Sequence, residues 1–393
     1  CRTQGTVSDR PVGAYLDALK AELEMLAGGL PPDVTLSRMH WGGGTPTILS
    51  AAMMADLAEA VAAVLPMAPG AEFSIEIDPN EIDAERMEAL AKAGLTRASI
   101  GVQDFDPEIQ DTIGRKQDFD VTRRAVELIR AHGIRSLNAD IVYGLPHQTR
   151  GRITETVQKL LSFGPDRVAL YGYAHVPWMA RRQSLIPTDA LPDPKERLEL
   201  FDVARRLFVW DGYDEIGIDH FAVPHDGLSI AARTGRLRRN FQGYTDDTAE
   251  VLIGLGASAI SRFPQGYAQN ATATSAYAGK VREGRFATAR GHVFSGEDRM
   301  RGRMIESLMC QFRIDADEIV RDFGIERSRL ARLFDETNRR FEGLLVVGPR
   351  GLEIPPQARP LTRMVERAFD LHLPEQAGHK SAISEAADGD NSA

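Results

Sequence analysis

The sequence predicts an α/β protein whose main sheet is parallel. Short apolar runs recur between Leu36 and Ile218, and segments with helical periodicity separate them. This alternation is typical of repeated β-α units, in which each helix crosses back over the sheet so that successive strands run in the same direction. The length of 393 residues exceeds the usual size of one domain, so we expect one large domain and a smaller appendage.

Six strands are expected, because six short runs of apolar and β-branched residues are bounded by turn residues. They cover residues 36–41, 73–77, 97–102, 138–143, 168–171 and 215–218. Apolar residues three and four positions apart, such as Met54, Leu57 and Val61, indicate the helices between them. Such units form either a doubly wound sheet or a full or partial (β/α) barrel, and spacing alone does not decide. Both bind ligands at the C-terminal ends of the strands.

The pattern changes after residue 225, where we expect the first domain, residues 1–225, to end. A basic run at 233–239 and a glycine-rich run at 253–259 predict that residues 226–295 extend the core with loops that cover a site. Residues 296–375 are expected to form a small winged-helix-like cap, with helices at 298–311 and 326–342 and a hairpin at 344–354. Residues 376–393 lack apolar periodicity and are predicted to be a disordered tail.

Composition excludes several classes of protein. The net charge of -9 argues against a nucleic-acid partner, because such binding needs a basic surface. No apolar run approaches the length of a membrane span, so we expect no membrane partner. With only Cys1 and Cys310 the chain has no disulfide framework, which favours a cytoplasmic location. The sequence begins at Cys1 without an initiator Met, so we expect a fragment.

Three glycines follow the first expected strand directly, in His40-Trp-Gly-Gly-Gly-Thr-Pro46. Glycine lets the backbone approach a ligand closely and expose its amide groups to an anion. The spacing fits neither a P-loop nor a dinucleotide-binding motif. The segment is a candidate ligand loop, and a tight structural turn is an equally good interpretation.

Polar side chains lie near the ends of the next three expected strands. Taken singly, Glu76 is better explained by a structural salt bridge, Asp140 by capping, and Gln103 and Arg115 by a loop hydrogen bond or a surface charge. Together with Gly43, however, Glu76, Gln103 and Asp140 occupy the ends of four successive strands. Enzymes of the (β/α) type build their sites there, so the set predicts a ligand site.

Histidines and arginines supply weaker candidates. His175 and His220 also follow expected strands, although a hydrogen-bonded loop imidazole explains each slightly better than catalysis does. The nine histidines show no metal-ligand spacing, so no metal ligand is expected among them. Six arginines form either a solvated face or a carboxylate-binding surface: Arg181, Arg182, Arg233, Arg236, Arg238 and Arg239.

Eight segments together resemble the oxygen-independent coproporphyrinogen III oxidases, which are radical S-adenosylmethionine enzymes. They occur in the order typical of that family and reach to about Leu373. The segments are Trp41-Gly-Gly-Gly-Thr-Pro46, Ile75-Glu-Ile-Asp-Pro79, Gly101-Val-Gln-Asp-Phe105, Ile141-Val-Tyr-Gly-Leu-Pro146, Tyr173-Ala-His-Val-Pro177, Asp219-His-Phe-Ala222, Arg239-Asn-Phe-Gln-Gly-Tyr-Thr245 and Tyr267-Ala-Gln-Asn270.

The resemblance implies a partial (β/α) barrel that binds a 4Fe-4S cluster and two molecules of S-adenosylmethionine. By position, one set of residues matches the family's contacts to the cluster-bound molecule: Gly43, Gly44, Thr45, Glu76 and Ile260. A second set matches contacts to the other molecule: Gln103, Arg115, Asp140 and Ala174. No catalytic side chain is assigned.

The implied reaction is the oxidative decarboxylation of coproporphyrinogen III to protoporphyrinogen IX in haem synthesis. In that family the reduced cluster cleaves S-adenosylmethionine to a 5′-deoxyadenosyl radical, which takes hydrogen from a propionate β-carbon. The substrate radical then loses carbon dioxide and an electron to leave a vinyl group, on two rings. The arginines are expected to meet the substrate's carboxylates. An electron donor, an electron acceptor and a monomeric state are also expected.

The family's cluster motif, Cys-x-x-x-Cys-x-x-Cys-x-Cys, is not present as a whole. Cys1, followed by Arg2-Thr-Gln-Gly5, resembles its last cysteine, which is not a cluster ligand in the family. A cluster needs three thiolates, so we expect its ligands upstream of Cys1 and this chain, as written, to be inactive. Cys310 lies in an expected helix and is predicted to be a small buried residue.

Three other functions agree less well with the sequence. The closest is a haem chaperone of the same superfamily, which shares the barrel and the glycine loop but delivers haem; the segment Arg239 to Thr245 favours the oxidase. A cluster-free hydrolase or aldolase using Glu76, Asp140 and a divalent metal lacks ligand spacing. A winged-helix nucleic-acid binder disagrees with the acidic composition.

Overall fold

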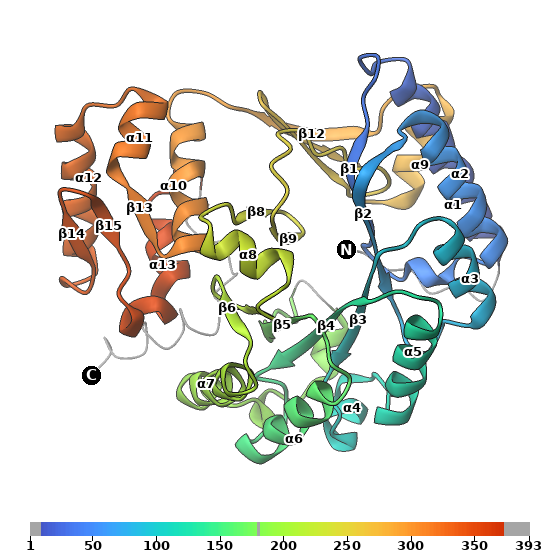
Figure 1. Ribbon diagram of the computed structural model, residues 1–393, viewed down its shortest axis with the longest axis horizontal. Coiled ribbons are helices and arrows are strands. Elements are labelled where there is room, and N and C mark those ends of the chain that lie inside the picture. Colours follow the sequence, from blue (N-terminus) through green and yellow to red (C-terminus); the bar gives the residue numbers. More distant parts are fainter. Residues whose placement is uncertain (1–8, 179–180, 373–393) are drawn as a thin grey trace. The chain divides into compact units, whose positions relative to one another are not determined.

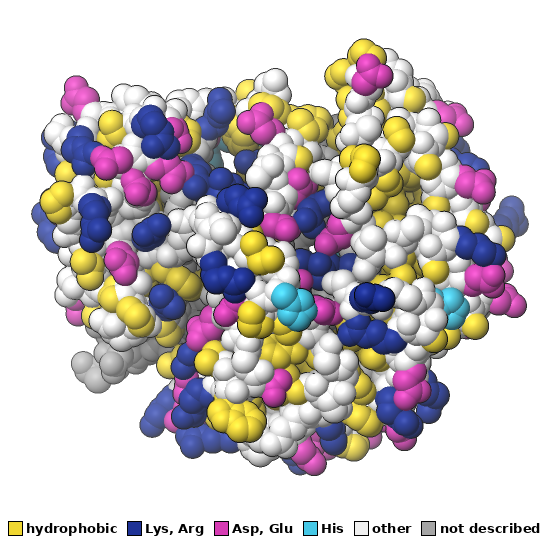
Figure 2. Space-filling view, in the orientation of Figure 1, with side chains coloured by type: hydrophobic (Ala, Val, Ile, Leu, Met, Phe, Trp, Pro, Cys, Tyr) yellow, Lys and Arg dark blue, Asp and Glu magenta, His cyan; other side chains and the backbone are white. Residues whose placement is uncertain are grey.

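The computed structural model describes residues 9–178 and 181–372 (Figure 1). Cys1, the expected tail at 376–393 and the side chains of Arg181 and Arg182 therefore lie outside the described residues. None of the described helices combines the length and the hydrophobicity that a membrane-spanning segment needs. On the face drawn in Figure 2, acidic and basic side chains are interspersed and do not form one basic patch.

The largest sheet has seven strands, and its arrangement confirms the predicted α/β fold class. Their order is β1-β2-β3-β4-β5-β7-β6, so in the described chain β1 and β6 are the two edges and the sheet is open, as in a partial barrel. The strands are β1 (Leu36–Trp41), β2 (Met67–Ile77), β3 (Arg97–Gln103), β4 (Ser136–Tyr143), β5 (Arg167–Gly172), β6 (Asp214–Ile216) and β7 (His220–Ala222). The chain divides into two compact units, which are described separately below.

The first unit consists of Cys1–Val102, Gln117–Ala139 and Asp247–Phe294. Its strands β1, β2 and β3 are parallel neighbours, as predicted. The helices are α1 (Asp9–Ala27), α2 (Ala51–Val64), α3 (Ala84–Lys92), α5 (Phe119–Ala131) and α9 (Thr274–Arg282). A separate antiparallel sheet contains β10 (Ile260–Phe263), β11 (Gly266–Asn270) and β12 (Thr288–Val293).

Local sequence explains where the helices of this unit begin and which face they bury. The Ser50 side chain accepts a hydrogen bond from the Met53 N–H and so caps α2, and Asp118 caps α5 in the same way. In α2 the predicted stripe of Met54, Leu57 and Val61 is buried. The first helix, α1, contacts both α2 and α9 (Figure 1). Residues distant in sequence therefore share one core.

The second unit consists of Gln103–Lys116, Asp140–Asp246 and Ser295–Ala393. Around β5, β6 and β7 it contains α4 (Pro107–Ile113), α6 (Arg150–Leu161), α7 (Pro194–Trp210) and α8 (Gly227–Arg233). A two-stranded sheet pairs β8 (Arg238–Asn240) with β9 (Gly243–Thr245). The described residues also contain four 3-10 helices: Pro46–Ile48 in the first unit, and Arg181–Leu185, Thr188–Ala190 and Pro356–Leu361 in the second. Residues 226–295, expected to contribute loops, thus also contain helices and short strands.

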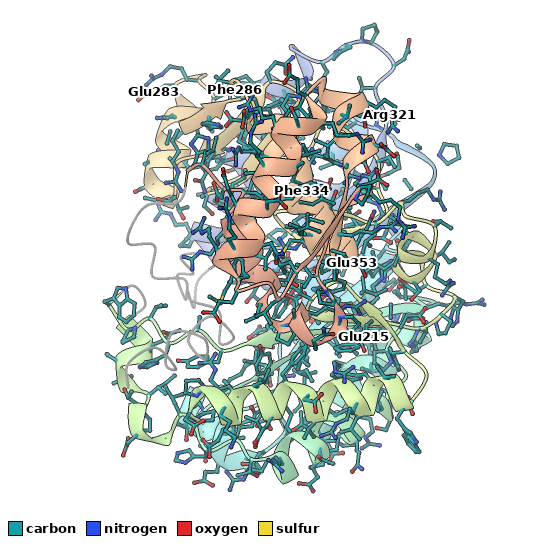
Figure 3. All side chains as sticks on the ribbon, turned by 90° about the vertical axis from the view of Figure 1, so that its left-hand side faces the viewer. Glu215, Glu283, Phe286, Arg321, Phe334 and Glu353 are labelled. Carbon is teal, nitrogen blue, oxygen red and sulfur yellow. The ribbon has the colours of Figure 1, made fainter. Side chains whose placement is uncertain are left out.

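The C-terminal part of this unit has its own hydrophobic core. It contains α10 (Asp298–Gln311), β13 (Arg313–Asp315), α11 (Ala316–Phe323), α12 (Arg327–Arg340), β14 (Val346–Gly348), β15 (Gly351–Glu353) and α13 (Thr362–Arg367). The hairpin of β14 and β15 pairs with β13 as well, a winged arrangement. Phe334, labelled in Figure 3, is 2% exposed among these helices. The sequence predicted α10, α12 and the hairpin, but not α11, α13 or β13.

The predicted sixth strand differs most from the structure. It was expected at residues 215–218, but β6 ends at Ile216, Gly217 turns with φ +56, and the chain returns as β7. Strand β7 is antiparallel to both β5 and β6. The positive φ explains the reversal, because only glycine adopts it without strain. His220 is therefore the first residue of a strand, not part of a loop after one.

Candidate cofactor-binding site

The glycine loop, residues 42–44, meets Glu76 at the C-terminal ends of β1 and β2. Strand β1 ends at Trp41, and Gly43 and Gly44 follow with φ of +81 and +143. These conformations favour glycine and turn the loop away from the strand direction. The Gly43 N–H donates to Glu76 Oε2 at 3.2 Å. The structure thus brings together two residues that the sequence placed at neighbouring strand ends.

Glu76 precedes the last residue of β2, and its side chain is 46% exposed. Besides the Gly43 N–H, its carboxylate faces the His40 imidazole, with 3.7 Å between Nε2 and Oε1. The simpler interpretation of Glu76, a structural salt bridge, has its partner in His40, although the pair is not fully buried. With 46% of its side chain exposed, Glu76 is accessible to a ligand, and a carboxylate favours a cationic one.

Ile260 belongs to the same unit and begins β10. The loop before it folds back tightly, because a Cβ on Gly254 would lie 2.5 Å from the Ile260 carbonyl oxygen. The Gly254 N–H also donates to Ser261 Oγ at 3.0 Å. The predicted glycine-rich loop therefore fixes the start of the strand that carries Ile260.

The second set of predicted residues lies in the other unit. Gln103 is the last residue of β3 and has φ +66, which is unusual for a residue with a side chain. Arg115 follows the left-handed Gly114 cap of α4. Ala174 lies two residues after β5, and its carbonyl accepts a hydrogen bond from Gln183 Nε2 at 3.0 Å. Asp140 lies within β4, three residues before Tyr143, where the predicted strand also ends.

A buried carboxylate that the sequence interpretation missed orders the segments around this set. Asp104, which is 0% exposed, accepts hydrogen bonds from Thr156 Oγ1 at 2.8 Å and Gln148 Nε2 at 2.7 Å. Gln148 Oε1 in turn accepts the Gly144 N–H at 2.7 Å. Burial raises the pKa of Asp104 despite these hydrogen bonds. The sequence offered one indication that Asp104 matters, because it directly follows the candidate residue Gln103.

The two candidate histidines have hydrogen-bond partners. His175 lies between two hydroxyl groups, with Tyr173 Oη 3.3 Å from Nδ1 and Thr188 Oγ1 3.3 Å from Nε2. This geometry agrees with the loop-imidazole interpretation. His220 Nδ1 lies 2.7 Å from Asp219 Oδ1, and its ring contacts Tyr244 edge-on at 5.0 Å between centroids.

Asp219 is held by charges on two sides. Its Oδ1 pairs with His220 and its Oδ2 lies 3.3 Å from Arg363 Nη2. Burial alone would raise the pKa of Asp219, but the His220 hydrogen bond and the charges of His220, Arg363 and Arg239 outweigh it and lower the pKa. Arg239, one of the candidate arginines, lies over the Tyr244 ring at 5.5 Å, whereas Arg233 forms an exposed pair with Asp214.

Comparison with known proteins agrees with this geometry. The model of the radical SAM superfamily matches residues 12–160. The oxygen-independent coproporphyrinogen III oxidase of Paracoccus denitrificans is 64% identical over 98% of this chain and 85% of its own length. The chain belongs to the oxygen-independent coproporphyrinogen III oxidase family.

Other members of this oxidase family support the assignment. A coproporphyrinogen III oxidase of Cereibacter sphaeroides is 57% identical over 95% of this chain and 83% of its own. The solved structure of the Escherichia coli coproporphyrinogen III oxidase, a radical SAM enzyme, matches with a TM-score of 0.90 and 34% identity. It covers 95% of this chain and 86% of the other. The protein is thus a radical SAM oxidoreductase with the partial barrel of that family.

Radical SAM proteins use a 4Fe-4S cluster and S-adenosylmethionine, and the described residues fit these groups unequally. The glycine loop and the half-exposed Glu76 carboxylate suit the sulfonium cofactor. For the cluster, the described residues contain one cysteine, Cys310, and burial raises its pKa to about 12. A cluster needs thiolate ligands, so no ligand set for it lies among the described residues.

Proposed function

We propose that this protein converts coproporphyrinogen III to protoporphyrinogen IX by oxygen-independent oxidative decarboxylation, in the cytoplasm. The observation that carries the proposal is the 64% identity to an oxidase of this name across 98% of the chain. The haem-chaperone alternative is less favoured, because relatives over nearly the whole chain are named as oxidases.

The first proposed cofactor site lies in the unit that contains β1 and β2. We assign five residues to the cluster-bound S-adenosylmethionine: Gly43, Gly44, Thr45, Glu76 and Ile260. The glycine loop supports this by allowing close approach of the backbone, and Glu76 by offering negative charge to a cationic ligand. Bound there, the cofactor would supply the radical chemistry that oxidative decarboxylation of a propionate side chain requires, and these residues would bind and orient it.

The second proposed site lies in the other unit. We assign Gln103, Arg115, Asp140 and Ala174 to a second S-adenosylmethionine. The strained φ of Gln103 supports this, because strain of this kind persists only where surrounding contacts hold it. The buried Asp104 provides such contacts, since its hydrogen bonds fix the residue after Gln103 to α6. These residues bind and orient; none is assigned a proton-transfer step.

Other parts of the proposal concern partners and organisation. The substrate is anionic, so basic side chains such as Arg236 and Arg238 are proposed to meet its carboxylates. An electron donor, an electron acceptor and a monomeric state are proposed with them. We also propose that residues 1–225 form the core, 226–295 its extension and 296–375 the cap.

The test is anaerobic turnover by protein produced from its complete gene, with the cluster reconstituted. Conversion of coproporphyrinogen III in the presence of S-adenosylmethionine supports the proposal. Glu76→Gln is expected to lower turnover at least tenfold, whereas Glu59→Gln, on the exposed face of α2, keeps wild-type turnover. If the protein binds haem stoichiometrically and forms no protoporphyrinogen, the oxidase proposal fails and the haem-chaperone function takes its place.

A further inference from the structure

His40 lies beside the proposed site but has no assigned role. It is the fifth residue of β1, and its side chain is 25% exposed. Its Nδ1 lies 2.9 Å from Ser74 Oγ on β2, and its Nε2 faces Glu76 Oε1 at 3.7 Å. Both partners are two positions apart on the neighbouring parallel strand, so they lie on the same face of the sheet. His40 therefore bridges a strand hydroxyl and the candidate carboxylate.

The carboxylate of Glu76 favours states of His40 in which Nε2 carries a proton. A neutral imidazole has one N–H and one lone pair. A lone pair on Nε2 would face the negatively charged Glu76, which is unfavourable. In the neutral ring an Nε2–H can point toward the carboxylate while Nδ1 accepts from the Ser74 hydroxyl. In a protonated ring Nδ1–H donates to Ser74 Oγ, whose own hydrogen can go to the Met39 carbonyl oxygen at 3.4 Å, and Nε2–H still faces Glu76. In either state His40 presents an N–H to Glu76.

The glycine loop closes over this pair. A Cβ on Gly42 would lie 2.5 Å from His40 Nε2 and 2.8 Å from Glu76 Oε1. The Gly43 N–H occupies the other carboxylate oxygen at 3.2 Å. Glu76 is thus held from both sides, by an imidazole at Oε1 and by the loop backbone at Oε2. These two contacts restrict the orientations open to the carboxylate.

We propose that His40 is a positioning residue that orients the Glu76 carboxylate toward a cationic group of S-adenosylmethionine. The inference rests on the proposed function of Glu76. Pre-orienting a binding group reduces the conformational entropy lost when the ligand binds, so its removal weakens binding more than it slows chemistry.

Two substitutions distinguish the contribution of Nδ1 of His40 from that of Nε2. His40→Asn keeps an amide near Nδ1 and its Ser74 contact but withdraws the donor from Glu76. His40→Gln places an amide N–H near the position of Nε2 and keeps the contact to Glu76. The control is His147→Asn, because His147 Nδ1 also lies near a carboxylate, Glu108, at 3.9 Å, but outside the proposed site.

The readouts are binding of radiolabelled S-adenosylmethionine by equilibrium dialysis, KM and kcat, and the thermal midpoint of each variant without cofactor. His40→Asn is expected to weaken binding and raise KM about tenfold with kcat changed less than about threefold. His40→Gln and His147→Asn are expected within about threefold of wild type.

Wild-type binding by His40→Asn would overturn the inference. So would equal loss in both His40 variants together with a lowered midpoint, since that indicates a structural role only. If the wild type binds S-adenosylmethionine but does not convert coproporphyrinogen III, the proposed function fails, and the binding series still tests His40.

Discussion

The Gly256 N–H donates a hydrogen bond of 2.8 Å to the buried carboxylate of Glu22, 234 residues earlier in the chain. Glu22 is 2% exposed and also accepts from Asn270 Nδ2 and Tyr277 Oη, each at 2.7 Å. Three donors replace the water that the carboxylate loses on burial. Helix α1 is thereby fixed to the glycine-rich loop that leads to Ile260.

Replacing Glu22 by Gln is expected to destabilise the protein. The amide offers one acceptor oxygen instead of two and brings an N–H group toward existing donors, so at least one buried donor loses its partner, at a cost of about 1–3 kcal/mol. Chemical denaturation measures the change. Glu24→Gln, on the exposed face of the same helix, should leave the midpoint unchanged; an equal effect of the two substitutions would contradict the assignment.

Gly217→Ala is expected to cost more stability than Gly212→Ala. Both glycines have positive φ, +56 and +93, so alanine strains the backbone at each by about 1–2 kcal/mol. Only at Gly217 would the new Cβ also overlap the Tyr244 ring, at 2.2 Å, whereas nothing lies within 4 Å at Gly212. The overlap should add about 1–3 kcal/mol in denaturant unfolding. Equal losses of stability in the two variants would show that the Tyr244 side chain moves aside at little energetic cost.

Asp219 should make stability depend on pH in the acidic range. Its pKa is lowered in the folded protein, so its contribution is fully present above the ordinary carboxyl pKa of 3.8 and is lost as pH falls through the lower folded value. Asp219→Asn should therefore be less stable than wild type near neutral pH, by about 1–3 kcal/mol. The gap should narrow below about pH 4, where Asp219 begins to protonate. Unfolding midpoints of both proteins measured across pH 3–7 test this. A difference in stability that widens toward low pH would contradict the prediction.

Cys310 is expected to resist thiol reagents in the native protein. It is 6% exposed, and burial raises its pKa to about 12, so at pH 8 roughly one molecule in ten thousand carries the reactive thiolate. Peptide-resolved mass spectrometry after iodoacetamide treatment should find Cys310 unmodified in native protein and modified in guanidinium. Rapid native labelling would mean that α10 opens readily.

Gly42→Ala should weaken S-adenosylmethionine binding without unfolding the protein. The new Cβ would meet the far ends of two side chains, His40 and Glu76, which can move aside but then lose their orientation. Binding is expected to fall about tenfold with little change in the thermal midpoint. The control is Gly279→Ala, where a Cβ meets nothing within 4 Å. Unchanged binding in Gly42→Ala would argue against a Glu76 carboxylate that is oriented before the ligand binds.

Much of the fold could be predicted from local patterns. The strand at 36–41 and the helix at 298–311 were predicted with the bounds that the structure gives, because apolar periodicity is a local property. The reversal at Gly217 was missed, since one glycine in a short apolar segment does not reveal whether the chain continues or turns. The contact of Gly43 with Glu76 was foreseeable, because neighbouring strand ends meet in a parallel sheet.

By itself the sequence determined the α/β class, the ordered segments that place the chain in its family, and the strand ends that carry the candidate residues. Only the tertiary structure decided which charged groups are buried and what holds them. Glu22 looks like any acidic residue on a helix, and Asp219 like any loop acid, until residues far along the chain surround them. Burial of a charge depends on partners from distant segments, and a local pattern does not specify those partners.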